Sequence, residues 1–182
     1  MTRYFFIKKF SPLFFLFVLF FLLWRSLFYA HTHELPSALI GEPLPHFQLK
    51  TLYAPHSFLT PTVFHGQVSL LNVWATWCQA CSQEQEMLMK ISQDYHIPIY
   101  GIDYKDNADA AKKWLQDYGN PYISIGSDPS GDTAIDLGVY GTPETFIISP
   151  HGKIIYRHVG VIDQHTWDHV LYPLIQQYRD TQ

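Results

Sequence analysis

The chain has 182 residues, enough for one domain with a substantial core but not for two once an N-terminal segment is set aside. Four basic side chains and no acidic one lie in the first thirty residues, so the rest of the chain carries eight Lys and Arg against sixteen Asp and Glu. That excess of negative charge repels phosphate backbones, which argues against nucleic acid as a partner.

The N-terminus contains a long apolar segment. Residues 10–24 carry no charge, and apolar residues continue to residue 30 after the single Arg25. The stretch 10–30 is about as long as the roughly 20 residues that cross the hydrocarbon of a bilayer as a helix. Arg3, Lys8 and Lys9 precede it, so the positive-inside tendency keeps the N-terminus in the cytoplasm and exports the remainder.

A cleaved signal peptide is the alternative for this segment. Small residues normally precede a cleavage site, whereas Leu27, Phe28 and Tyr29 precede Ala30 here. We therefore expect an uncleaved anchor. The predicted division of the chain is a cytoplasmic N-terminus and transmembrane helix at 1–30, a tether at 31–40, and one folded domain at 41–182.

The first elements of the folded domain differ in how regular their patterns are. Residues 47–67 show the least regular pattern, and we assign them extra N-terminal strands. The run at 68–74 is almost continuously apolar, which predicts a central strand buried on both faces. Apolar residues at helical spacing then predict a helix over 81–95.

Further strands and a helix follow in the second half of the domain. Residues 97–103 are typical of a second buried strand, and the next helix has Asn107 as its N-cap and Gly119 as its C-terminal stop. Residues 144–149 and 153–159 are predicted strands joined by a Pro-His-Gly turn, which indicates a hairpin.

Asp163 is the expected N-cap of a final helix that reaches residue 178, with Pro173 ending or kinking it midway. Helices interleaved with strands predict a parallel portion of a sheet, and the closing hairpin adds antiparallel strands. The predicted fold class is α/β, with a mixed central β-sheet, helices on both of its faces, and an N-terminal transmembrane helix in addition.

The only cysteines, Cys78 and Cys81, lie where the central strand meets its helix. A cysteine at the start of a helix faces unsatisfied backbone N–H groups and the positive end of the helix dipole, which favour thiolate. Cys81 lies one turn further along the same face, near enough to attack a mixed disulfide formed at Cys78. This spacing predicts a thiol–disulfide oxidoreductase in which an exposed Cys78 thiolate attacks a substrate disulfide and Cys81 resolves the mixed disulfide.

The alternative functions for the cysteine pair are a structural disulfide and metal ligation. A purely structural disulfide closes so short a loop that it constrains the unfolded chain little. For metal ligation, the chain lacks a second cysteine pair at zinc spacing, and its histidines lie in the tether or far from the cysteines in the sequence. We therefore expect no metal and no cofactor.

Two segments resemble a known family. Residues 71–81 (LNVWATWCQAC) and 138–146 (GVYGTPETF) resemble the thioredoxin superfamily, and within it the DsbE/CcmG group. Further similarity at 103–106, 119–122 and 156–158 extends the resemblance from residue 41 to about 178. It implies a thioredoxin fold and a membrane-tethered periplasmic reductant of cytochrome c maturation on the bacterial inner membrane.

The resemblance also implies partners. The expected clients are apocytochrome c and the chaperones that carry it, whose cysteines must be reduced before haem can bond to them. Electrons would come from a membrane thiol transporter of the DsbD/CcdA type. The group often has a proline directly after the first cysteine, whereas this chain has Gln79, so reduction potentials of relatives do not transfer.

Thr142 and Pro143 match the position of a cis-proline that lies beside the redox cysteines in this group. A cis bond before proline costs only about 0.5–1 kcal/mol, whereas other residues pay several times more. The backbone of Thr142 is then expected to pair with an extended substrate as an added strand. The alternative is an ordinary loop proline before a strand.

Three more residues are expected to support the site. Trp77 directly precedes Cys78, Glu84 matches an acidic position of the group, and Glu144 follows the predicted cis-proline. Acids near Cys78 oppose its thiolate by like-charge repulsion, which makes the reduced form a better electron donor. The alternative for both acids is a solvated carboxylate on the surface.

The sequence leaves alternative functions for the domain. A generic periplasmic reductase resembling TlpA or ResA would use the same chemistry on other clients. A copper-binding assembly factor resembling Sco proteins would need a CxxxC motif and a distal histidine, and the spacing here is CxxC. A peroxiredoxin would use a single peroxidatic cysteine rather than a WCxxC motif.

Overall fold

The computed structural model describes residues 3–29, 38–54 and 56–179, which divide into the units Met1–Leu35 and Pro36–Gln182. The first unit is the helix α1 (Arg3–Tyr29). Within the described residues, no helix combines the length and the apolar character that crossing a membrane requires. The predicted anchor therefore stays a prediction, and residues 30–37, which include most of the predicted tether, lie outside the described residues.

The second unit is built on a five-stranded sheet in the order β5-β4-β3-β6-β7. The central strand β3 pairs in parallel with β4 and antiparallel with β6, as the predicted mixed sheet requires. Each residue of β3 is buried, which confirms the two-sided burial expected from its apolar run. The strands are β3 (Ser69–Trp74), β4 (Ile99–Tyr104), β5 (Ser124–Asp128), β6 (Glu144–Ile148) and β7 (Ile154–Val159).

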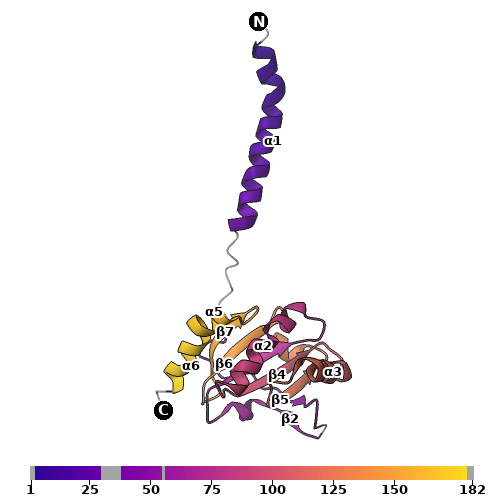
Figure 1. Ribbon diagram of the computed structural model, residues 1–182, viewed down its shortest axis with the longest axis vertical. Helices are drawn as coiled ribbons and strands as arrows, with labels where there is room; N and C mark the ends of the chain where they lie inside the picture. The colour runs from indigo at the N-terminus through magenta and orange to yellow at the C-terminus, as the bar shows by residue number, and fades with distance from the viewer. Residues whose placement is uncertain (1–2, 30–37, 55, 180–182) are drawn as a thin grey trace. The chain divides into compact units, whose positions relative to one another are not determined.

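Helices cover both faces of the sheet, as predicted (Figure 1). One face packs against a cluster that includes Leu88 of α2 (Gln79–Gln93) and Leu115 of α3 (Ala108–Tyr118). The other face is covered by α4 (Asp132–Asp136) and by the N-terminal elements. Those elements are β1 (Leu49–Lys50), β2 (Phe58–Leu59) and the 3-10 helix η1 (Pro61–Phe64), so residues 47–67 do contain short strands.

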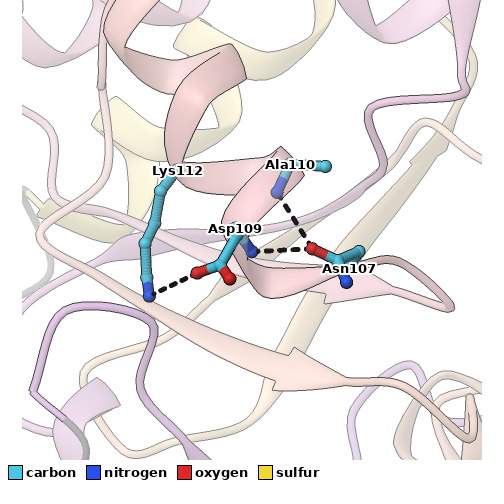
Figure 2. Close-up of polar contacts among 4 residues, drawn as sticks. All are labelled: Asn107, Asp109, Ala110 and Lys112. Atoms are coloured by element: carbon cyan, nitrogen blue, oxygen red, sulfur yellow. Dashed lines mark hydrogen bonds and ion pairs between the residues drawn. The ribbon is translucent and has the colours of Figure 1, made fainter.

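The helix α3 begins and ends where the sequence predicted. Asn107 is its N-cap, and the Oδ1 of Asn107 accepts hydrogen bonds from the backbone N–H groups of Asp109 and Ala110 at 3.0 and 3.1 Å (Figure 2). Lys112 pairs with Asp109 within the first turn. Gly119 ends the helix with a φ of 94°, a conformation that glycine adopts without a steric penalty.

The patterns in the sequence did not predict β5 or α4. The strand β5 reads SIGSD, which lacks the apolar run or the strict alternation that indicates a strand. Gly126 is in β5 because Leu49 of β1 packs against its backbone, where an added Cβ would lie 2.7 Å from the Leu49 Cβ. Contact with another element, rather than local propensity, therefore determines this strand.

The C-terminal helix is continuous through Pro173, where an end or kink was expected. Asp163 caps α5 (Gln164–Thr166) by accepting a 2.7 Å hydrogen bond from the Thr166 N–H, as predicted. A π-helical turn, η2 (Trp167–Leu171), follows and leads into α6 (Tyr172–Arg179). Proline has no N–H to donate, and the wider turn just before it changes the hydrogen-bond pattern without ending the helix.

Candidate active site

Cys78 and Cys81 form a disulfide at the junction of β3 and α2. Cys78 is the N-cap of α2, and its Sγ accepts a 3.1 Å hydrogen bond from the backbone N–H of Cys81. When the pair is reduced, this N–H and the positive end of the helix dipole favour a thiolate at Cys78. The predicted position of Cys78 at the start of the helix is thus confirmed, and its role as the attacking cysteine stays a prediction.

The accessibility of Cys78 differs from the expectation. Only 6% of Cys78 and 1% of Cys81 is exposed, so the prediction of an exposed Cys78 is wrong for the disulfide form. Both cysteines are buried because they belong to the hydrophobic cluster between the sheet and α2. Cys78 still keeps the larger exposed fraction, which leaves it the easier of the two for a substrate to reach.

The predicted cis-proline lies at the same end of the sheet as the cysteines. The Thr142–Pro143 peptide bond is cis, so the predicted isomer is confirmed. Because β3 and β6 run antiparallel with Val73 opposite Glu144, the end of β3 that leads to Cys78 adjoins the start of β6 that follows Pro143. Pairing of the Thr142 backbone with a substrate stays a prediction.

The loop before Cys78 is held by the loop that follows β4. The backbone N–H of Thr76 donates to Asp106 Oδ2 at 2.5 Å, and the indole Nε1 of Trp77 donates to the Lys105 carbonyl oxygen at 3.2 Å. Trp77 nevertheless leaves 58% of its surface exposed. It therefore presents a fixed aromatic side chain to solvent immediately before the redox pair.

Glu84 is fully buried, so the alternative of a surface carboxylate is wrong for this residue. It lies three residues after Cys81 on α2, which places the two side chains on the same helix face. Its Oε1 accepts from the Nδ2 of Asn72 at 2.9 Å, and its Oε2 accepts from the Ile162 N–H at 3.1 Å. Burial raises the pKa of Glu84 from 4.5 to about 7, although these two hydrogen bonds lower it.

Asn72 joins Glu84 to the rest of the buried polar cluster. Its Nδ2 also donates to Thr145 Oγ1 at 2.9 Å, and its Oδ1 accepts from the Tyr122 hydroxyl at 2.7 Å. Burial, and then the charge of Glu84, raises the pKa of Tyr122 well above its usual value. The phenol therefore stays protonated and donates its hydrogen bond to Asn72 Oδ1. We call Asn72, Glu84, Tyr122 and Thr145 the Asn72 cluster.

Asp103 is a second buried acid on this face, and sequence analysis assigned it no function. It lies opposite Trp74 in the parallel ladder of β3 and β4, and among the described residues neither of its carboxylate oxygens has a hydrogen-bond partner. Burial, and then the charge of Asp106, raises its pKa to about 7. The available signal was an acid at the end of an otherwise apolar strand.

Glu144 is also fully buried, but its surroundings differ from those of Glu84. Its Oε2 pairs with the Nε of Arg157 at 2.7 Å, so its charge is neutralised within the protein. Side chains alternate along a strand, and Glu144 lies opposite Val73, which puts it on the sheet face away from Asn72 and Glu84. The structure thus brings Glu84, but not Glu144, to the face where Cys81 packs.

The described residues contain no group of three or more His, Cys, Asp or Glu side chains arranged to hold a metal ion. The cysteines are paired with each other, and the arrangement of helix N-terminus and buried acid is suited to exchange between thiols and disulfides. The chemistry that the site can perform is therefore the transfer of two electrons to a second disulfide or from a second pair of thiols.

Comparison with known proteins identifies relatives with this chemistry. Residues 39–171 match the Redoxin family. The thiol:disulfide interchange protein DsbE of Pseudomonas aeruginosa is 46% identical over 147 residues, covering 81% of each chain. DsbE of Escherichia coli K12 is 43% identical over 146 residues, covering 80% of this chain and 78% of its own.

Solved structures show the same fold at lower identity. A DsbE-type protein of Chlorobium tepidum superimposes with a TM-score of 0.65 at 24% identity, covering 75% of this chain and 94% of its own. A secreted thiol-disulfide isomerase of Corynebacterium glutamicum gives a TM-score of 0.61 at 23% identity, covering 73% and 85%. These matches support a thioredoxin-like fold for the second unit.

The first prediction separates the roles of the two cysteines. Cys81→Ala should accumulate mixed disulfides with a peptide disulfide substrate, because Cys78 attacks and no thiol resolves the product. Cys78→Ala should accumulate few, since Cys81 is almost fully buried. Non-reducing gels and mass spectrometry of the two variants provide the measurement. Equal accumulation by both variants would contradict this assignment.

The second prediction concerns Glu84 and pH. The folded pKa of about 7 exceeds the ordinary 4.5, so the native state binds this proton more tightly and loses stability as pH rises between these values. From pH 5 to 8, the free energy of unfolding should fall by about 2 kcal/mol more in the wild type than in Glu84→Gln. Chemical denaturation at each pH measures the difference.

The matched control for this prediction is Glu86→Gln, which changes an exposed acid on the same helix. It should leave the slope of stability against pH close to that of the wild type. An unchanged slope in Glu84→Gln would mean that the Glu84 carboxyl titrates at its ordinary pKa.

Proposed function

Since the chain belongs to the Redoxin family and, within it, to the DsbE thiol:disulfide interchange proteins, we propose that it reduces disulfides during cytochrome c maturation. The protein is a thiol–disulfide oxidoreductase with a thioredoxin-like fold. The proposal adds the direction of electron flow, the clients and the location.

We infer the direction of electron flow from one observation. Two acids, Glu84 and Asp103, are buried on the same sheet face as Cys81. When these carboxyls ionise, they oppose thiolate formation in the reduced pair by like-charge repulsion. Destabilised thiolates make the reduced protein a better electron donor. The buried acids thus favour a reductant over an oxidant.

The proposed reaction follows from the geometry at the helix N-terminus. The Cys78 thiolate attacks a disulfide of apocytochrome c or of its chaperones, forming a mixed disulfide and releasing one client sulfur, which takes up a proton. Cys81 loses its proton and attacks Cys78 Sγ, which releases the second client thiolate and leaves the Cys78–Cys81 disulfide. A membrane thiol transporter of the DsbD/CcdA type returns two electrons to the pair.

The proposed location is the outer side of a bacterial inner membrane. The apolar residues 10–30 would anchor the chain, and the basic residues before them favour a cytoplasmic N-terminus. The domain that begins near residue 41 would then lie in the periplasm. In an oxidising compartment the cysteines of the clients form disulfides. A reductant in the same compartment would return them to thiols.

The third prediction identifies the clients. Full-length Cys81→Ala, expressed in the native cell, should be recovered with apocytochrome c or its chaperones bound through Cys78. Mass spectrometry of the trapped complexes is the measurement, and Cys78→Ala is the matched control. If other proteins are trapped and these clients are absent, the protein is a general periplasmic reductase rather than one for cytochrome c.

The fourth prediction concerns the anchor. A phosphatase fused to the C-terminus should be active outside the cytoplasm and sediment with membranes, because residues 1–30 stay attached. Replacing the basic residues before the apolar segment by acids should reduce export. A shortened soluble form that starts near His31 would contradict an uncleaved anchor.

A further inference from the structure

Tyr140 is an exposed aromatic residue at the end of the sheet that carries the redox pair, and the mechanism above does not use it. It lies in the loop between α4 and β6, two residues before Thr142, and 61% of its surface is exposed. An exposed aromatic side chain in a loop ordinarily has several rotamers available. Here two contacts fix it, one on the backbone and one on the ring.

The first contact fixes the backbone. The Oε1 of Glu144 accepts hydrogen bonds from the N–H of Tyr140 at 3.0 Å and from the N–H of Gly141 at 3.3 Å. Glu144 is itself fully buried and paired with Arg157. A charged, hydrogen-bonded carboxylate inside the protein therefore clamps the loop that leads to Thr142 and Pro143.

The second contact fixes the ring. The guanidinium carbon of Arg157 lies 4.7 Å from the centroid of the Tyr140 ring, within the range of a cation–π interaction. Arg157 is buried, and its guanidinium carbon also lies 6.0 Å from the Phe146 ring centroid. The guanidinium is therefore held in place and cannot shift together with the Tyr140 ring. The guanidinium covers one side of the Tyr140 ring, and most of the residue remains open to solvent.

Tyr140 lies at the same end of the sheet as the disulfide. Its loop enters β6 at Glu144, which pairs with Val73 near the end of β3, and the loop with Trp77 and Cys78 leaves β3 at this end. Trp77 is likewise exposed and fixed by its hydrogen bond to the Lys105 carbonyl. Two fixed aromatic residues thus lie in two loops at this end of the sheet. Trp77 is in the loop after β3, and Tyr140 is in the loop before β6.

We propose that Tyr140 is a specificity-determining residue that contacts polypeptide substrates carrying an aromatic or aliphatic residue beside the reacting disulfide. A ring that is already fixed loses little conformational entropy on binding, which is why rigid tyrosines so often dominate binding energy. Glu144 and Arg157 are positioning residues, because they act through Tyr140. This inference rests on the oxidoreductase activity and not on the identity of the client.

The test uses two synthetic peptide disulfides that differ only in the residues flanking one cysteine, which are Phe and Leu in one and Gly and Ser in the other. The second-order rate of reduction by the full-length protein is measured for each, and the readout is the ratio of the two rates. Tyr140→Ala should lower this ratio about tenfold, the effect of losing one strong contact. Tyr140→Phe should retain the wild-type ratio.

Two further variants complete the design. Ile123→Ala removes an apolar residue that is 64% exposed just before β5, at the opposite end of the sheet, and should leave the ratio unchanged. Arg157→Lys keeps the charge but loses the planar guanidinium over the ring, and should lower the ratio by a smaller factor. If Tyr140→Ala slows both peptides equally or leaves both unchanged, the proposal is wrong, and Tyr140 does not select substrates.

Discussion

The hydrogen bonds of Asn72 hold together the end of the domain where the chemistry occurs. Asn72 lies in the central strand and bonds to Glu84 of α2, Thr145 of β6 and Tyr122 before β5. Glu84 extends the connection to the backbone of Ile162. An unpaired polar group in this interior costs about 1–3 kcal/mol, so each member of the Asn72 cluster depends on the others.

The central sheet separates two buried carboxylates that sequence analysis had given one role. Glu84 lies on the face that carries Cys81 and accepts hydrogen bonds from neutral N–H groups. Because its pKa is about 7, its charge changes near neutral pH. Glu144 lies on the other face and pairs with Arg157, where it orders the loop before Pro143. In the proposed mechanism Glu84 opposes the thiolates by its charge, whereas Glu144 orders the loop that leads to Pro143.

The sequence predicted the parts of the fold that local patterns encode. The apolar run of β3, the caps of α3, the cis bond at Pro143 and the place of Cys78 at a helix start follow from composition, spacing and resemblance. It did not predict β5, which depends on packing against β1, nor the continuity of the last helix through Pro173.

The burial of Glu84 and Glu144 also required the structure, because nothing in the sequence around either acid shows what covers it. The central claim is that acids buried beside Cys81 make the cysteine pair a reductant. Equilibrating the full-length protein with a thiol–disulfide buffer of known potential measures its reduction potential. The account predicts a value near that of thioredoxin, about −270 mV, and a value near the roughly −120 mV of DsbA would contradict it.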